Sequence, residues 1–126
     1  MKKIISTTDA PAAIGPYSQA VEINGTLYIS GQIPVDPSTG KLAEGDISVQ
    51  TERVFRNIAA ILGSAGYTFR DVVKTTCMLS DIADFKAMNE VYAKYYTGEY
   101  PARATFAVKS LPLGALVEIE TVAVRK

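Results

Sequence analysis

The chain has 126 residues, of which 48% are hydrophobic, and its 13 basic and 13 acidic residues give a formal net charge of zero. This length fits one compact domain, and the hydrophobic content is high enough to bury a core, which excludes a disordered chain. The lack of a basic excess argues against nucleic acid as a partner, because binding to phosphates depends on clustered lysine and arginine.

The single cysteine, Cys77, excludes an intrachain disulfide, which suits a reducing compartment. No apolar stretch approaches the length needed to span a membrane. The apolar run near the N-terminus stops at residues 7–9, too early for a signal peptide. We therefore expect a cytoplasmic protein with no membrane partner.

The first predicted element is a β-hairpin. Two β-prone runs, 17–23 and 26–30, flank the pair Asn24-Gly25, which is favoured where both residues of a tight turn have positive φ. A loop punctuated by proline and glycine follows over residues 31–45.

From about Asp46 the spacing of the apolar residues predicts an amphipathic helix. Asp46 or Ser48 is available to cap its start, and Gly63 and Gly66 lie where it should end. Residues 72–79 then predict a strand that is rich in β-branched and apolar residues, for which we expect burial on both faces.

A second helix begins near Asp81 or Asp84 and ends by Gly98, and two strands complete the chain, 103–108 and 116–124. The order of elements is strand, strand, helix, strand, helix, strand, strand. Right-handed crossovers place both helices on one face of a single mixed sheet. The predicted fold class is α+β, a two-layer sandwich that forms one domain over residues 1–126.

The other face of this sheet has no helix left to cover it. We expect apolar residues such as Leu27, Ile29, Cys77 and Leu79 to make exposure of that face to solvent unfavourable. Burial against further copies of the chain, in a closed symmetric oligomer, is the simplest solution.

The residues that are missing exclude several kinds of chemistry. Without histidine there is no Ser-His-Asp or Cys-His pair, and with one cysteine a zinc site is not expected. No phosphate-binding loop or nicotinamide-binding fingerprint follows a predicted strand. The residues therefore argue against a zinc site and against these two kinds of nucleotide-binding site.

Arg103 is the strongest candidate for a functional residue. It lies in a predicted strand between Ala102 and Ala104, which leave room for a ligand, and a guanidinium group binds a carboxylate through two hydrogen bonds. A half-exposed structural arginine is the alternative, and it is the commoner case.

Glu118 and Glu120 share one face of the last predicted strand, together with the apolar Val122 and Val124. A carboxylate on such a face needs a partner, and Arg103 on the preceding strand is the natural one. The pair is either purely structural or part of a site that holds an anion and activates a water, and both interpretations stay open at this point.

The other polar candidates carry weaker signals. Tyr17 and Ser30 lie at the ends of the hairpin, where packing and strand-end roles are common, and Asn89 lies on the second helix beside its apolar stripe. Cys77 is interpreted as a small core residue rather than a nucleophile. The stripe itself, with Tyr92 among its members, is interpreted as core.

Three segments together resemble the RidA (YjgF/YER057c/UK114) family. They are Gly15-Pro16-Tyr17-Ser18-Gln19-Ala20, then Ser30-Gly31-Gln32-Ile33-Pro34, and finally Pro101-Ala102-Arg103 with Val117-Glu118-Ile119-Glu120. The resemblance runs over nearly the whole chain, in order and without large gaps. It implies a chorismate-mutase-like α+β fold, a homotrimer with clefts between subunits, and no metal or cofactor.

The resemblance also implies an activity, 2-iminobutanoate/2-iminopropanoate deaminase, in which reactive imines or enamines are hydrolysed to 2-ketoacids and ammonia. In this interpretation Arg103 binds the substrate carboxylate and Glu118 positions or activates the attacking water. The same cleft is expected to be lined by Tyr17, Ser30, Gly31, Asn89 and Thr105. Several relatives have cysteine where this chain has Thr105, whose backbone can supply the same contact.

Other functions remain compatible with the sequence. A non-catalytic member of the family that binds 2-ketoacids or related metabolites as a regulator would use the same arginine. An RNA-directed activity is disfavoured by the zero net charge. A chaperone-like role would use the uncovered face of the sheet.

Overall fold

The computed structural model describes residues 1–125. A tight turn at Asn24 and Gly25 joins two neighbouring strands of its main sheet. Both residues have positive φ, 50° and 77°, the backbone that an Asn-Gly pair adopts most readily. The turn joins β2 (Ala20–Ile23) to β3 (Thr26–Gln32) as an antiparallel hairpin. The predicted hairpin is confirmed, with its first strand beginning at Ala20 rather than at residue 17.

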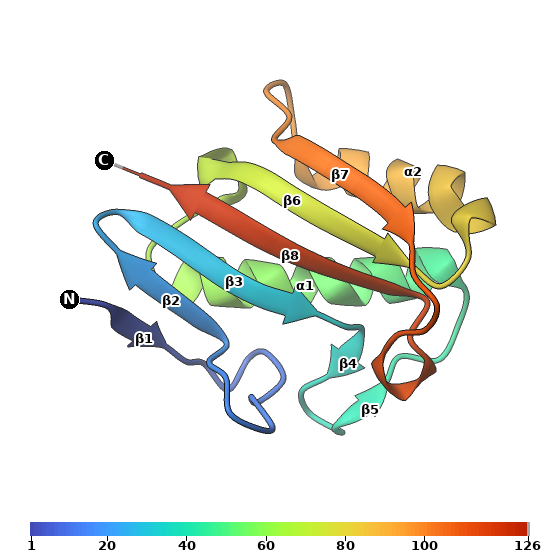
Figure 1. The fold of residues 1–126 in the computed structure, drawn as a ribbon, viewed down its shortest axis with the longest axis horizontal. Coiled ribbons are helices and arrows are strands. Elements are labelled where there is room, and N and C mark those ends of the chain that lie inside the picture. The colour runs from blue at the N-terminus through green and yellow to red at the C-terminus, as the bar shows by residue number, and fades with distance from the viewer. Residues whose placement is uncertain (126) are drawn as a thin grey trace.

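The other strands and the two α-helices are, in chain order, β1 (Lys3–Ile5), β4 (Val35–Asp36), β5 (Lys41–Leu42), α1 (Ile47–Ser64), β6 (Val72–Leu79), α2 (Phe85–Tyr95), β7 (Ala102–Ala107) and β8 (Val117–Val124). Six strands form one mixed sheet in the order β1-β2-β3-β8-β6-β7, and β4 pairs with β5 separately. Both helices lie behind the sheet in Figure 1, on the same face. The predicted two-layer α+β architecture is therefore confirmed.

Local chemistry sets the start of α1. The Asp46 carboxylate accepts a hydrogen bond from the backbone N–H of Val49 at 3.1 Å, so Asp46 rather than Ser48 is the N-cap. The chain leaves the helix at Ala65 and turns at Gly66, whose φ of 80° favours glycine.

The strand that carries Arg103 is not adjacent to the strand that carries Glu118. β7 joins the edge of the sheet parallel to β6, with Arg103 opposite Thr75. β8 runs antiparallel to both β6 and β3 and lies between them (Figure 1). The expectation of neighbouring strands was wrong, because the connection after β7 carries the chain past β6 before it re-enters the sheet.

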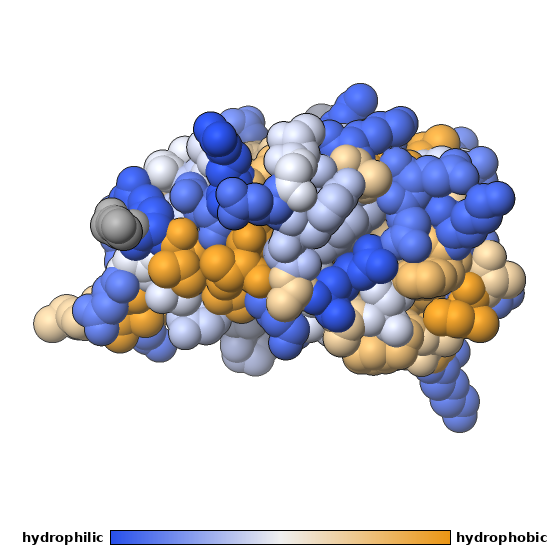
Figure 2. Space-filling view, turned by 90° about the horizontal axis from the view of Figure 1, so that it is seen from above, coloured by the Kyte–Doolittle hydropathy of each residue, from blue (hydrophilic) through white to orange (hydrophobic). Residues whose placement is uncertain are grey.

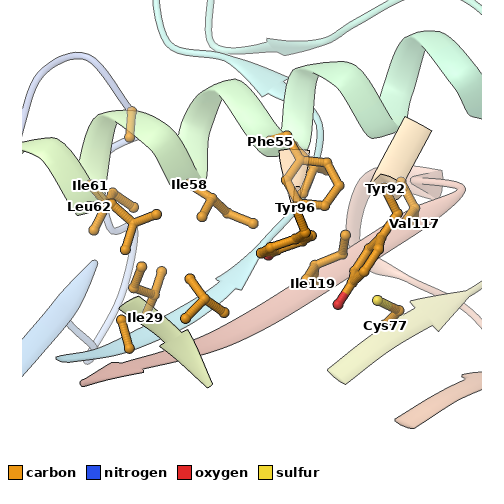
Figure 3. Close-up of a cluster of buried hydrophobic side chains, with 14 of the residues drawn as sticks. Ile29, Phe55, Ile58, Ile61, Leu62, Cys77, Tyr92, Tyr96, Val117 and Ile119 are labelled. Carbon is orange, nitrogen blue, oxygen red and sulfur yellow. The ribbon is translucent and has the colours of Figure 1, made fainter. Parts of the chain in front are cut away.

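The core fills the space between the sheet and the helices. Phe55 and Ile58 of α1 are fully buried there and face strand residues that include Cys77 and Ile119 (Figure 3). Leu27, Ile29, Cys77 and Leu79 all belong to this core and are at most 3% exposed. The prediction that these side chains lie on the uncovered face was therefore wrong. Side chains alternate along a strand, and the uncovered face carries the neighbours of these residues instead.

The uncovered face carries the alternating set instead, and that set is also partly apolar. Tyr28, Phe106 and Val124 are 51%, 45% and 43% exposed on it. In the view from above in Figure 2, hydrophobic residues form one group left of centre and another toward the lower right, with hydrophilic residues between them. The β6 side chains on this face are intermediate or exposed, so the expected burial of that strand on both faces is not found within one chain.

None of the helices that the structure describes is long and apolar enough to cross a lipid bilayer.

A buried amide ties the loop after β3 to α1. Asn57 is fully buried, and its Nδ2 donates to the carbonyl oxygens of Ile33 at 3.2 Å and Val35 at 2.9 Å. Its Oδ1 accepts a hydrogen bond from Nη2 of Arg53 at 2.9 Å. Asn57 therefore fixes the segment that follows Gly31.

We expect Asn57→Ala to lower the free energy of unfolding by about 1–3 kcal/mol, because two buried carbonyl groups lose their donor. Urea denaturation measures the change. The exposed neighbour Arg56 provides the control, since Arg56→Ala should stay within about 0.5 kcal/mol. Equal midpoints for both variants would contradict the proposed tether.

Candidate functional site

Arg103 is held in place by α2. Its Nη1 donates to Oδ1 of Asn89 at 2.7 Å, and its guanidinium carbon lies 4.6 Å from the ring centre of Tyr92 and 5.5 Å from that of Phe85. Stacking on aromatic rings and a hydrogen bond from one nitrogen fix the plane of the guanidinium. Its remaining N–H groups stay available for an anion.

A hollow opens beside this arginine. It is lined by Asn89, Tyr92, Tyr100, Pro101 and Arg103, together with Ala93. Polar groups and a cation converge there, as a carboxylate-binding site requires. Of the predicted site residues, Arg103 and Asn89 meet in this hollow.

Thr105 lies two residues after Arg103, on the same side of β7, and opposite Cys77 of β6. Its Oγ1 is buried and has no hydrogen-bond partner among the described residues. Burial raises the pKa of the Cys77 thiol to about 11. Cys77 is thus a poor nucleophile, as the sequence predicts.

Glu118 lies on the opposite face of the sheet. Its neighbours along β8, Val117 and Ile119, are fully buried against the helices, so the Glu118 side chain points to the uncovered face. Burial raises the pKa of the Glu118 carboxyl, and the negative charge of Glu120 raises it further. The carboxylate packs against Gly31, where any Cβ would overlap it.

The remaining candidates lie near Gly31. Oγ of Ser30 donates to the carbonyl oxygen of Ser18 at 2.6 Å. Tyr17 is 54% exposed and lines, with Gly31, a largely apolar cavity of about 250 Å³. These residues surround the Glu118 side of the sheet rather than the Arg103 side.

The candidate residues thus form two groups within one chain. The arginine group comprises Arg103, Asn89 and Thr105 on the helix side at the sheet edge. The carboxylate group comprises Glu118, Gly31, Ser30 and Tyr17 on the other side. A guanidinium beside Glu118 would lower its carboxyl pKa, whereas that pKa is raised, so the predicted contact between Arg103 and Glu118 is not formed within a chain.

Sequence reasoning missed the aromatic support of Arg103. Phe85, Asn89 and Tyr92 are spaced four and three residues apart, which places them on one face of a helix. That spacing was interpreted as a core stripe, yet the same face also carries the polar Asn89. The amide of Asn89 within this aromatic stripe was the signal from which the contact with a polar partner could have been predicted.

Among residues 1–125, no three histidine, cysteine, aspartate or glutamate side chains gather closely enough to hold a metal ion.

Comparison with known proteins identifies the family. The model of the family described as Endoribonuclease L-PSP matches residues 7–125. The chain belongs to this family, which is also known as RidA/YjgF. The resemblance found in the sequence motifs is therefore confirmed.

Individual relatives are similar over nearly their full length. The 2-iminobutanoate/2-iminopropanoate deaminase of Mus musculus is 50% identical, and the match covers 99% of this chain and 93% of the mouse protein. A crystal structure of YyfA from Yersinia pestis, a protein of unknown function of the conserved Rid family, is 51% identical with a TM-score of 0.97, covering 99% of this chain and 100% of that one. E. coli TdcF, crystallised with bound serine, is 40% identical with a TM-score of 0.93, covering 98% and 99% of the two chains.

The raised pKa of Glu118 predicts a pH-dependent effect on stability. The folded pKa lies above the unfolded value, so the ionised carboxylate destabilises the fold increasingly as pH rises from about 4.5 through the folded pKa. Glu118→Gln removes this penalty, so its unfolding midpoint should exceed that of the wild type at pH 7. The advantage should vanish below about pH 4, where both states are protonated.

NMR titration of the Glu118 side chain tests the cause directly. Its pKa should lie above the ordinary value and should fall in Glu120→Gln, which removes the like charge. An unchanged pKa in Glu120→Gln would show that Glu120 has no part in the shift.

Proposed function

We propose that this protein hydrolyses small 2-imino acids and their enamine tautomers, such as 2-iminobutanoate and 2-iminopropanoate, to 2-ketoacids and ammonia. The observation that carries the proposal is the 50% identity, over 99% of the chain, to a mouse enzyme named for that activity. The inventory of reactive residues agrees with it, because imine hydrolysis needs no metal, cofactor or strong nucleophile.

The reaction adds water to a carbon that is already electrophilic. The water oxygen forms a bond to the imine carbon, the C–N bond then breaks, and both water protons leave with the nitrogen as ammonia. The catalyst has to orient the substrate and to move protons. An arginine and a carboxylate are sufficient for these tasks.

Arg103 supplies the orientation. Its plane is fixed by Asn89 and Tyr92, and its free N–H groups match the two oxygens of the substrate carboxylate. Glu118 accepts the proton of the attacking water.

The remaining candidates complete the site. Gly31 lies against the Glu118 carboxylate and, like Tyr17, lines the adjoining cavity, and Ser30 precedes Gly31 on β3. Thr105 lies on the arginine side, two residues after Arg103, and its buried Oγ1 has no partner among the described residues. Each of these contacts is a proposal for the ligand-bound state.

We propose further that the two groups of residues meet between two copies of the chain in a homotrimer. Two observations support this: Arg103 and Glu118 lie on opposite faces of one sheet, and the face with Glu118 also exposes Tyr28 and Val124. A cyclic arrangement brings one face of each subunit to the other face of its neighbour. The cytoplasm is the proposed compartment, in keeping with the buried free thiol of Cys77.

A second function uses the same site without turnover. TdcF was crystallised with bound serine, so a fold of this kind holds a small amino acid. A regulatory protein that binds 2-ketoacids needs only the arginine group. Binding without imine hydrolysis would identify this alternative.

A direct assay separates the two functions. Imine is generated in situ by an amino acid oxidase and its decay is followed with wild type, Arg103→Ala and Glu118→Gln. The wild type should accelerate hydrolysis. Arg103→Ala should lose at least about tenfold in kcat/KM with its carboxylate contact, and Glu118→Gln about 10²-fold or more in kcat with its base. No acceleration by the wild type would overturn the proposed activity.

Mixed oligomers test the shared site. Arg103→Ala and Glu118→Gln subunits are unfolded together, refolded and assayed, with each variant refolded alone as the control. About a quarter of randomly formed interfaces combine an intact Arg103 with an intact Glu118 from the neighbour, so about a quarter of wild-type activity should return. No recovery from a mixed population would place both residues of each site in one chain.

A further inference from the structure

The cavity beside Gly31 is not accounted for by the polar chemistry of the reaction. It has a volume of about 250 Å³, and its lining is mostly apolar, with Ile14, Tyr17, Ile33 and Leu113 among the residues. At about 30 Å³ for each water molecule in the liquid, this is the space of about eight waters. Such a cavity is large enough for an unbranched alkyl chain of several carbons.

The position of the cavity relates it to the carboxylate group. Gly31 borders the cavity, and the carboxylate of Glu118 packs against the same glycine. Tyr17, a second candidate site residue, also lines it. A molecule whose reacting carbon lies beside Glu118 therefore has this cavity within reach.

Two of the side chains that line the cavity, Ile14 and Leu113, are exposed to solvent, and we call them the rim. Ile14 is 89% exposed and Leu113 is 69% exposed. Leu113 has a φ of 58°, a left-handed conformation that is unfavourable for leucine and that strained functional loops retain. The backbone N–H of Ile14 donates to the hydroxyl of Tyr17 at 3.4 Å, which connects the rim to the candidate site.

Hydrogen bonds fix two less exposed lining residues of the cavity, Ile33 and Val35, which we call its floor. The carbonyl oxygens of both accept hydrogen bonds from the buried Asn57. An apolar cavity with a fixed floor and apolar rim residues binds an alkyl group by excluding water from both surfaces.

A 2-imino acid has three parts, and the structure offers a different environment for each. The carboxylate suits Arg103, and the imine carbon suits the water at Glu118. The hollow beside Arg103 is lined by Asn89 and tyrosines, whereas the cavity beside Gly31 is largely aliphatic. The third part, the side chain, therefore fits the aliphatic cavity.

We propose that this cavity binds the alkyl side chain of the substrate, with Ile14 and Leu113 as the residues that determine the preferred chain length. The inference rests on the proposed imine hydrolase function. Among the 2-imino acids that the protein hydrolyses, it predicts a preference for straight-chain aliphatic ones with side chains longer than methyl, and it makes Ile14 and Leu113 specificity residues outside the reacting groups.

The test compares 2-iminopropanoate with 2-iminohexanoate, whose side chain is longer by three methylenes. Each buried methylene is worth about fourfold in kcat/KM. The wild type should therefore favour the longer imine by at least about tenfold. Leu113→Ala and Ile14→Ala should each reduce that preference at least about threefold, mainly through KM for 2-iminohexanoate. Ile82→Ala truncates another exposed aliphatic residue, which lies outside the cavity, and should leave the preference unchanged.

Binding of the product analogues 2-oxopropanoate and 2-oxohexanoate, measured by calorimetry, separates the two proposals. Tighter binding of 2-oxohexanoate that weakens in Leu113→Ala supports the cavity even if no imine is hydrolysed, a result that would overturn the activity alone. Hydrolysis of both imines with no chain-length preference, or with a preference unchanged in both variants, would overturn the cavity assignment and leave the activity standing.

Discussion

Side chains of a β-strand alternate between the two faces of its sheet, and this alternation determines how a site can be built on this fold. On β8 it directs Val117 and Ile119 into the core and Glu118 to the opposite face. On β7 it directs Arg103 toward α2, where Asn89 and two aromatic rings hold it. Within one chain the sheet therefore separates Arg103 from Glu118, and the proposed site takes these two residues from two copies.

The same alternation explains why the uncovered face carries both apolar side chains and the candidate residue Glu118. Glu118 and Glu120 share it with Tyr28 and Val124, and burial raises the pKa of the Glu118 carboxyl. An assembly that covers this face removes apolar surface from water and at the same time encloses the carboxylate. In the proposed trimer, assembly and formation of the site are one event.

Local signals in the sequence predicted the elements well. Asn24-Gly25 located the hairpin, Asp46 located the start of α1, and the run of β-branched residues matched β6 at residues 72–79. β1 was missed because it has only three residues, of which Ile5 alone is buried, and β4 and β5 because each has two residues. Such short strands depend on partners distant in sequence rather than on their own composition.

Long-range features were harder to predict. β8 enters between β3 and β6, so strands that follow one another in the chain, β7 and β8, are not neighbours in the sheet. The sequence identified Arg103 and Glu118 by residue type and by family resemblance, but not the sheet that separates them. The aliphatic cavity combines residues from the N-terminal segment, the end of β3 and the loop before β8, and no local pattern reveals such a combination.

The most direct measurement of the central claim is a crystal structure of the wild-type protein with bound 2-oxobutanoate. The account predicts that the ligand carboxylate lies within hydrogen-bonding distance of Arg103 from one subunit, while its keto carbon faces Glu118 of a neighbouring subunit. A ligand held by Arg103 and Glu118 of the same chain, or bound away from both residues, would contradict the account.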